Sequence, residues 1–331
     1  MSLLDHALSS ALKPWAERLR ERLNLPVLVR WAVHDGEGPA WPLGRFDAPR
    51  VQILIRRPAA VPLLLSPSLE SLGEAYVEGH VDLIGPVVDL LDVAVRMARA
   101  GADPDARQHP GWVQRTIERV VHATQHSLAG DREAVQYHYD VSNDFYAQWL
   151  DPAMVYSCAY FEHGDEPLAV AQQAKIDHIL TKLRLQPGQR LLDIGCGWGA
   201  LVLRAAERYG VRCVGITLSQ NQFEMATERV RAAGLQDRVE IRLQDYREVQ
   251  GPFDRITSVG MFEHVGLKHL PAYFRIIHDL LAPDGWALNH GITSTDAANG
   301  ETAFGAGRFI DRYVFPQGEL PHIGTVLTTM Q

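Results

Sequence analysis

Residues 190–199 read Arg190-Leu-Leu-Asp-Ile-Gly-Cys-Gly-Trp-Gly199, an apolar strand that breaks into alternating glycines. Glycine lets the backbone turn sharply and pass close to a ligand, where a Cβ atom would collide. Turns of this kind follow strands of doubly wound sheets, which bind ligands beyond the carboxyl ends of their strands. The stretch therefore predicts an α/β fold with a small-molecule site at the turn that follows Ile194.

The C-terminal half supports this fold, because apolar spacing alternates between helical and strand-like from residue 168 onwards. The expected helices are Leu168–Leu185, Leu201–Tyr209, Gln220–Ala233 and His269–Leu281, and the expected strands are Leu191–Ile194, Val211–Ile216, Val239–Leu243, Arg255–Val259 and Trp286–His290. Such alternation predicts a parallel, Rossmann-like sheet that is covered by helices on both faces.

The N-terminal part has a different pattern, which predicts a smaller α/β domain. Leucines and Trp15 recur at helical spacing through the first helix, and β-rich runs follow at Val27–Val33 and Val51–Arg56. Pro86–Ala100 is a further expected helix, with proline in its first turn. The leucine stripe of the first helix either packs on the core of this domain or forms a membrane-binding face.

Composition narrows the class of protein. The 331 residues leave room for about two domains, and a net charge of −8 argues against a nucleic-acid partner. Residues 1–57 hold nine Lys/Arg against six Asp/Glu, which suits an anionic membrane face but equally fits ordinary scatter of charge. Three cysteines match no disulfide framework or metal-site spacing, so we expect no metal and a reducing compartment. We also expect no secretory signal and no membrane-spanning helix.

The glycine turn by itself does not choose between a nicotinamide cofactor and S-adenosylmethionine. A nicotinamide site requires an acid about 20 residues further on, which binds the ribose. The second strand instead ends in Val214-Gly-Ile-Thr-Leu-Ser-Gln-Asn-Gln222, which has no carboxylate. Together with the acid that precedes the glycines, Asp193, this favours S-adenosylmethionine.

Two further motifs, Tyr156-Ser-Cys-Ala-Tyr-Phe161 and Met261-Phe-Glu-His-Val-Gly266, complete a pattern with the glycine turn. The three together resemble the cyclopropane fatty acid synthases and mycolic acid cyclopropane synthases, a family of S-adenosylmethionine-dependent methyltransferases. The resemblance covers roughly residues 65–331. Phospholipid-acting members carry an additional N-terminal domain like a lipid carrier, and Leu72-Gly-Glu-Ala-Tyr-Val-Glu-Gly79 is similar to its recurring motif.

The resemblance divides the chain into a lipid- or membrane-associating domain at residues 1–105, a linker and helix at 106–135, and the methyltransferase domain at 136–331. A sheet of this family has seven strands, and we count five up to His290. We therefore expect the chain to lack the last two strands and a C-terminal site tyrosine, either as a fragment of a longer protein or as a degenerate paralogue. Residues 307–321 resemble a stretch that helps to form the family's lipid channel.

The resemblance also implies which residues bind the cofactor. The glycine turn and the second strand would hold the amino-acid and ribose parts, and the corner after the third strand would hold the adenine. The implied cofactor residues are Tyr156, Ser157, Asp193, Gly195, Gly197, Gly199, Thr217, Leu218, Gln222, Asp245, Tyr246 and Arg247. Asp245 has an alternative reading as a turn cap, which is common for aspartate after a strand.

A second implied group carries the chemistry. Methylation of an alkene leaves a cation that must lose a proton, and the family uses bound bicarbonate as the base. The implied catalytic residues are Cys158, Glu263, His290, the backbone of Ile292, and Tyr139 as an aromatic facing the reacting centre. Three alternatives stay open: Cys158 as a small buried hydrophobe, Glu263 as a helix cap, and His264 as the functional histidine. A covalent role for Cys158 is disfavoured, because a methylated thiol is a dead end.

The predicted function is transfer of a methylene carbon from S-adenosylmethionine to the cis double bond of a phospholipid acyl chain, which gives a cyclopropane ring. The alternatives are a methyl- or methylene-branched acyl product, a soluble small-molecule substrate, or a non-catalytic lipid-binding paralogue. The expected partners are membrane phospholipid and the membrane surface, with a possible homodimer. The expected location is the cytoplasm, at the inner face of the membrane.

Overall fold

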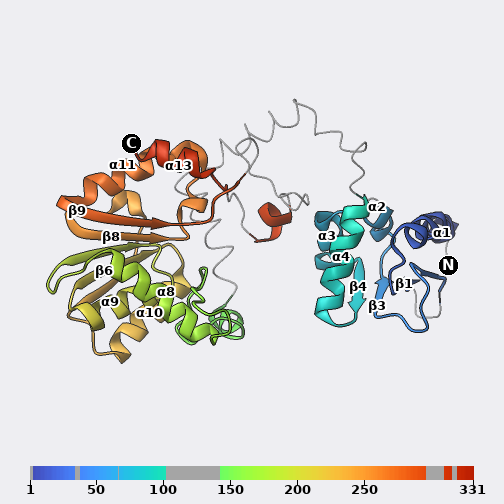
Figure 1. The fold of residues 1–331 in the computed structure, drawn as a ribbon, viewed down its shortest axis with the longest axis horizontal. Coiled ribbons are helices and arrows are strands. Elements are labelled where there is room, and N and C mark those ends of the chain that lie inside the picture. The colour runs from blue at the N-terminus through green and yellow to red at the C-terminus, as the bar shows by residue number, and fades with distance from the viewer. Residues whose placement is uncertain (1–2, 34–37, 66, 102–141, 296–308, 315–318) are drawn as a thin grey trace. The chain divides into compact units, whose positions relative to one another are not determined.

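The computed structural model describes residues 3–33, 38–65, 67–101, 142–295, 309–314 and 319–331. The chain divides into two compact units, Met1–Thr116 with Glu301–Val314, and Ile117–Gly300 with Phe315–Gln331. Figure 1 labels the helices and strands of both units. The predicted domain boundary at residue 105 and the predicted linker lie outside the described residues.

The second unit contains the predicted parallel sheet. Its five strands are β5 (Arg190–Ile194), β6 (Arg212–Thr217), β7 (Val239–Leu243), β8 (Phe253–Val259) and β9 (Leu281–His290). They lie in the order β7-β6-β5-β8-β9 and all pair in parallel. The fold class predicted from the sequence is therefore confirmed, whereas the two further strands expected beyond the chain stay a prediction.

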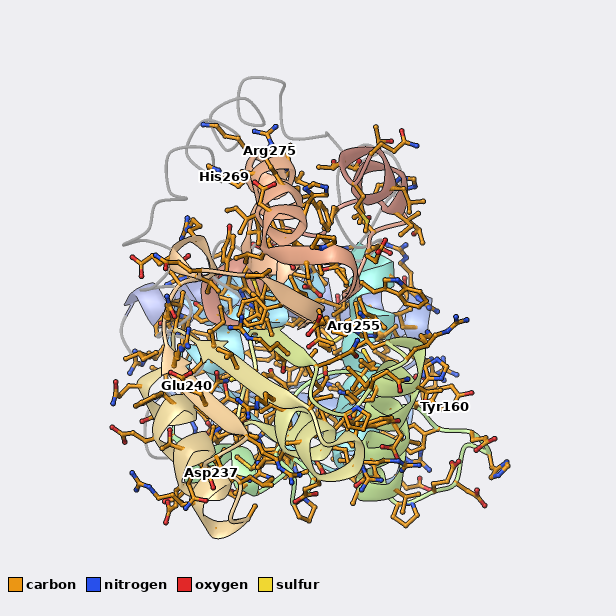
Figure 2. The ribbon with its side chains drawn as sticks, turned by 90° about the vertical axis from the view of Figure 1, so that its left-hand side faces the viewer. Tyr160, Asp237, Glu240, Arg255, His269 and Arg275 are labelled. Atoms are coloured by element: carbon orange, nitrogen blue, oxygen red, sulfur yellow. The ribbon has the colours of Figure 1, made fainter. Side chains whose placement is uncertain are left out.

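One strand begins earlier than predicted. β9 first pairs at Leu281, opposite Phe253, and its regular register resumes only at Trp286, opposite Arg255. Between these two pairs β9 contains more residues than β8, which makes a β-bulge. The alternation of apolar and polar residues in the sequence does not reveal such a bulge. The outer strand β7 carries the ion pair of Glu240 and Arg242 at 2.6 Å (Glu240 is labelled in Figure 2). Charges on an edge strand oppose pairing with another sheet.

Helices cover both faces of this sheet, because successive strand residues point to opposite sides. Leu191 belongs to a core with helices α8, α9 and α10, whereas Leu192 belongs to a core with α11 and α13. Figure 1 shows the same two layers. The helices of the unit are α7 (Asn143–Ala147), α8 (Leu168–Lys182), α9 (Ala200–Tyr209), α10 (Gln220–Ala232), α11 (Leu270–Leu280) and α13 (Ile323–Thr329).

The first unit is a four-stranded mixed sheet with helices, in the order β2-β1-β3-β4. Its elements are α1 (Leu3–Leu23), β1 (Val27–Trp31), β2 (Ala40–Pro42), β3 (Val51–Ile55), α2 (Ala60–Leu65), α3 (Leu69–Val77), β4 (Val81–Ile84) and α4 (Val87–Gly101). Leu12, Trp15 and Leu19 of α1 are buried in its core. For these residues of the leucine stripe, the structure shows packing rather than a free membrane-binding face.

The motif at residues 72–79 forms the end of α3, and a distant segment contacts it. Arg312 of the short helix η4 (Ile310–Val314) pairs with Glu74 at 3.1 Å and with Glu78 at 3.0 Å. The Tyr313 hydroxyl donates to Glu78 at 2.6 Å. A Cβ atom on Gly73 would lie 2.8 Å from the Phe309 ring, so glycine allows the segment to approach. Residues 309–314 therefore belong to the first unit, and their predicted role in a lipid channel stays a prediction.

Candidate active site

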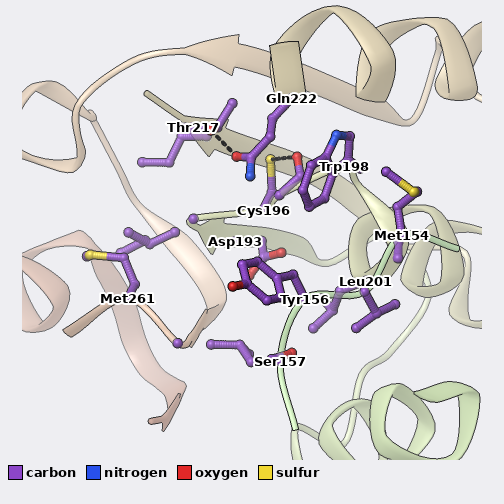
Figure 3. Close-up of a pocket in the computed structure, with 18 of the residues that line it drawn as sticks. Met154, Tyr156, Ser157, Asp193, Cys196, Trp198, Leu201, Thr217, Gln222 and Met261 are labelled. Carbon is purple, nitrogen blue, oxygen red and sulfur yellow. Dashed lines mark hydrogen bonds between the residues drawn. The ribbon is translucent and has the colours of Figure 1, made fainter. Parts of the chain in front are cut away.

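A cavity opens beyond the carboxyl ends of β5, β6 and β8, the edge at which a doubly wound sheet binds ligands. Figure 3 shows Asp193, Tyr156 and Ser157 near one another, and the hydrogen-bonded pair of Thr217 and Gln222 beyond them. The predicted cofactor residues that line the cavity are Tyr156, Ser157, Asp193, Gly195, Gly197, Thr217, Leu218, Gln222 and Tyr246. The edge of the sheet thus brings together residues that are far apart in the sequence.

The glycine turn forms the floor of the cavity. Gly195 and Gly197 have φ angles of 80° and 54°, in the left-handed region that favours glycine. The amides of Gly195 and Cys196 both donate to the Ile216 carbonyl, at 3.0 and 2.9 Å, which fixes the turn against β6. A Cβ atom at Gly195 would also come within 3.2 Å of Met261. The turn therefore keeps the backbone open toward a ligand.

An aromatic cluster holds the segment before residue 158 against this turn. Trp198 is buried, its indole N–H donates to Asn143 Oδ1 at 2.7 Å, and its ring lies 5.0 Å from that of Tyr146. Tyr146 in turn contacts Tyr156, with 5.4 Å between ring centroids. Buried aromatic contacts of this kind fix geometry as well as burying area. They place Tyr156 and Ser157 at the cavity.

Asp193 is the only Asp or Glu among the described residues that line the cavity, and it is 3% exposed. Its carboxylate accepts a hydrogen bond from the Thr257 hydroxyl at 2.8 Å. Burial raises the pKa of Asp193 to about 6, although the bond from Thr257 and the charge of Lys175 oppose that shift. A largely ionised carboxylate at neutral pH is suited to the cationic part of S-adenosylmethionine.

Thr217 and Gln222 form the next wall of the cavity. The Thr217 hydroxyl donates to Gln222 Oε1 at 2.7 Å and accepts from the Ser219 amide at 3.2 Å. Ser219 caps α10 through the Gln222 amide. The helix cap therefore orients the glutamine side chain without any ligand.

Three predicted cofactor residues lie elsewhere in the described structure. Asp245 accepts from the Arg247 amide at 2.9 Å and binds its guanidinium at 2.8 Å, so it caps the short helix η1 (Tyr246–Glu248). Neither of these two residues, nor Gly199 at the start of α9, is among the described residues that line the cavity. The capping alternative for Asp245 is thus realised, and its contact with adenine stays a prediction.

A second polar group lies at the ends of β8 and β9. Glu263, on the short helix η2 (Phe262–His264), is 7% exposed, and its Oε1 accepts from the Ile292 amide at 2.7 Å. Within the described residues, Glu263 Oε2 and His290 Nδ1 are both buried without a hydrogen-bond partner. A buried polar atom without a protein partner can be satisfied by water, a ligand or an ion, and five other side-chain atoms of the described residues share this state. Bicarbonate, which can both donate and accept, has the chemistry that each of these two atoms could bind.

The pKa values of Glu263 and His290 are shifted in opposite directions. Burial raises the pKa of Glu263, and the hydrogen bond from the Ile292 amide opposes the shift. Burial, followed by the charges of Lys175 and Lys182, lowers the pKa of His290. His290 is therefore neutral at physiological pH, with one ring nitrogen able to accept a proton.

The structure says less about the other predicted catalytic residues. Cys158 is exposed, so the alternative of a buried hydrophobe is wrong for this cysteine. Ile292 contributes its backbone amide to Glu263, while its side chain is exposed. His264 lines the cavity. Both His264 and His290 therefore remain candidates for the functional histidine. Tyr139 lies outside the described residues.

Sequence analysis missed Lys175, which lines the cavity from α8 and is 6% exposed. Its Nζ donates to the Ser157 hydroxyl at 2.6 Å. Burial lowers the pKa of Lys175 to about 8, against the opposing charges of Asp193 and Asp151. The signal was a lysine on the buried face of a helix, between Ala171 and Ile179, where a charge is rarely placed without a partner.

The parallel sheet, the glycine cradle and the polar groups beyond it define the class as an S-adenosylmethionine-dependent methyltransferase. The family described as mycolic acid cyclopropane synthetase matches residues 126–331. The chain is 43% identical over 311 residues to a probable fatty acid methyltransferase of Pseudomonas putida, covering 92% of this chain and 74% of that protein. It is 40% identical over 275 residues to the cyclopropane-fatty-acyl-phospholipid synthase of Escherichia coli K12, covering 82% and 67%.

Solved structures agree with these relatives. The mycolic acid cyclopropane synthase CmaA1, in complex with S-adenosylhomocysteine (SAH), superimposes with a TM-score of 0.56 at 42% identity, over 60% of this chain and 72% of that one. The chain therefore belongs to the mycolic acid cyclopropane synthetase family of S-adenosylmethionine-dependent methyltransferases.

Proposed function

We propose that this chain converts the cis double bond of an unsaturated phospholipid acyl chain into a cyclopropane ring, with bicarbonate as the proton acceptor. The observation that carries the proposal is Glu263 Oε2, which is buried without a hydrogen-bond partner among the described residues, while Oε1 of the same carboxylate accepts from the Ile292 amide. The relative in Escherichia coli named as a cyclopropane-fatty-acyl-phospholipid synthase supports the choice of reaction.

S-adenosylmethionine supplies the electrophilic carbon, and bicarbonate would supply a base that is small enough to reach the new methyl group. The protein would hold that base through Glu263 and His290, whose orphaned atoms have complementary roles. A carboxylate accepts, and a neutral imidazole nitrogen accepts or donates according to its tautomer. The cofactor cavity also has apolar residues in its lining, among them Val155, Ile194 and Leu201, and an apolar surrounding would limit the access of water to a carbocation.

A second candidate is a methyl-branched acyl product. The Pseudomonas putida relative, which is named as a probable fatty acid methyltransferase, is compatible with it. The two reactions share the transfer of carbon to an alkene and differ in where the proton is lost. The polar groups at the ends of β8 and β9 serve either outcome.

We also propose that the first unit meets the membrane surface, and that the protein acts there without spanning it. Ile84, Val87, Val88 and Leu91, at the end of β4 and the start of α4, expose between half and four-fifths of their surface. Apolar side chains that gather on one surface mark interaction sites more often than isolated ones do. Among the described helices, none is long and apolar enough to cross a bilayer. Co-sedimentation with phospholipid vesicles, compared between the unchanged chain and Val88→Asp, tests this role.

The experiment that tests the reaction is gas chromatography with mass spectrometry of total fatty acids from a cyclopropane-negative bacterium that expresses this chain. We expect an acyl species one CH₂ heavier than its unsaturated precursor, and its absence in Glu263→Gln. The Escherichia coli relative serves as the positive control for expression and extraction. A ring supports the first candidate and a branch the second. If the control makes product and this chain makes neither, the proposal fails, and a soluble substrate or a lipid-binding role takes its place.

A further inference from the structure

Lys175 is a buried cation in the cofactor cavity. Among the described residues that line the cavity, it is the only Lys or Arg, just as Asp193 is the only Asp or Glu. Burying an ammonium group is costly unless it is paired and hydrogen-bonded. A buried lysine with a single hydrogen-bond acceptor among the described residues therefore suits an anionic ligand.

The hydrogen bonds of Lys175 are incomplete in the described structure. An ammonium group has three donors, and the Ser157 hydroxyl accepts one of them at 2.6 Å. Asp193 and Asp151 attract the charge through space, without a hydrogen bond to Nζ. Two donors thus remain for a ligand in the cavity.

We propose that Lys175 binds the α-carboxylate of the methionine part of S-adenosylmethionine. The cavity offers one buried cation and one buried carboxylate, which together complement the carboxylate and the ammonium of an α-amino acid. Asp193 and Ser157 both line this cavity (Figure 3), and Ser157 is the residue to which Lys175 donates a hydrogen bond. The proposal rests on S-adenosylmethionine as the cofactor, and does not depend on which lipid is methylated.

The alternative anion is the bicarbonate of the proposed reaction. In addition to burial, the charge of Lys175 helps to lower the pKa of His290, and a Cys158 thiolate would favour the charged form of Lys175. However, it is Lys175 that lines the cofactor cavity, whereas Cys158, Glu263 and His290 are not among the described residues that do so. The position among Tyr156, Ser157 and Asp193 therefore favours the cofactor carboxylate.

Binding of this carboxylate has a consequence for pH. The groups that face Lys175 are Ser157, Asp193 and Asp151, together with Cys158 and His290. Burial sets the pKa of Lys175 to about 8, and a bound anion favours the charged form. The protein therefore takes up a proton on binding above this pH. Affinity for S-adenosylmethionine should fall as pH rises through about 8.

The decisive experiment compares two ligands that differ only in the carboxylate. S-adenosylmethionine and decarboxylated S-adenosylmethionine are titrated into the purified chain by calorimetry at pH 7. We expect the unchanged protein to prefer S-adenosylmethionine by about 10- to 100-fold, because hydrogen bonds to charged groups are worth about 1.5–3 kcal/mol. Lys175→Met should reduce this preference to less than about 3-fold, and Lys175→Arg should keep part of it.

The matched control is Lys182→Met, which removes an exposed lysine from the same helix. It should leave the preference unchanged. If Lys175→Met weakens the binding of both ligands equally, Lys175 has a structural role. If it changes neither affinity, the carboxylate binds elsewhere. Either result overturns the proposal. If the unchanged protein binds neither ligand, the cofactor assignment itself is wrong, and the proposal falls with it.

Discussion

The cofactor corner, at the ends of β5 and β6, and the catalytic corner, at the ends of β8 and β9, lie on the same sheet edge but are built differently. In the cofactor corner, Lys175 apart, protein groups bond one another: the Thr217 hydroxyl donates to Gln222, and the Thr257 hydroxyl donates to Asp193. In the catalytic corner, Glu263 Oε2 and His290 Nδ1 stay buried without partners among the described residues. The first corner is preorganised by its own bonds, and the second retains unmet bonding capacity.

This difference predicts which measured property a substitution in each corner changes. Removing one group from a satisfied network costs about one hydrogen bond. Removing a group that interacts only with the transition state lowers the reaction rate and leaves ground-state binding unchanged. Substitutions in the cofactor corner should therefore change affinity for SAH, and those in the catalytic corner should change turnover.

The largest effect is expected for Glu263→Gln. It keeps the size of the side chain but removes the carboxylate that would hold the bicarbonate base, so turnover should fall by about 1,000-fold, within the range that loss of general acid–base catalysis gives. The rate is measured as transfer of a labelled methyl group to lipid vesicles, and SAH affinity by calorimetry should change by less than about 2-fold. Glu240→Gln, on the exposed edge strand, is the control. A loss of SAH affinity that matches the loss of rate would erase the distinction between the corners.

The two histidines come next, because the comparison depends on which of them belongs to the catalytic corner. His290→Asn should lower turnover by about 100-fold, since the neutral imidazole can exchange a proton. His264→Asn should lower it by less than about 5-fold. The same labelled-methyl assay ranks both variants, and the reverse ranking would transfer the catalytic role to His264.

A smaller effect is expected for Thr217→Val in the cofactor corner. The substitution removes the donor to Gln222 and the acceptor for the Ser219 amide. SAH affinity should fall by about 10-fold, which corresponds to one hydrogen bond of about 1.4 kcal/mol. Turnover at saturating cofactor should stay within about 2-fold. Thr181→Val, on the exposed side of α8, provides the matched control, and equal losses in both variants would argue against a specific role for the pair.

The smallest effect concerns stability and Asp193. Its pKa is raised to about 6 in the folded protein, so the folded state holds this proton more tightly than the unfolded state does. The resulting stability is present at low pH and is lost as pH rises from about 4 through about 6. Asp193→Asn should therefore gain about 1–2 kcal/mol relative to the unchanged protein between pH 5 and pH 7.5. Thermal unfolding without ligand should show the difference in Tm widening by a few degrees, and a constant difference would contradict the shift.

Much of the fold was predictable because its signals are local. The alternating periods indicated all five strands of the second sheet, and the glycines marked the turn beyond β5. The start of β9 was not predictable, because the bulge between Phe253 and Arg255 depends on how two strands pair. The capping of η1 by Asp245 was foreseen only as an alternative, since the same residue type suits a cap and a ligand contact.

The site was predictable where a motif carries it and not where packing does. Tyr156, Ser157 and Glu263 stand in motifs, so the sequence indicated them. Lys175 belongs to no motif. Only the structure shows that its side chain, on α8, donates a hydrogen bond to Ser157. Likewise, nothing local to residues 309–314 indicates that Arg312 pairs with Glu74 and Glu78.

By itself, the sequence determined the class of fold, the glycine turn and the family, because periodicity, backbone freedom and motif residues are properties of neighbours along the chain. Only the tertiary structure decided which polar groups share a low-dielectric space. That decision brought Lys175 to Ser157, and the Ile292 amide to Glu263. It also left one carboxylate oxygen of Glu263 and one nitrogen of His290 buried without a partner among the described residues. The physical reason is that burial and pairing depend on contacts between distant segments, and these set both the pKa of each group and the ligand that it can hold.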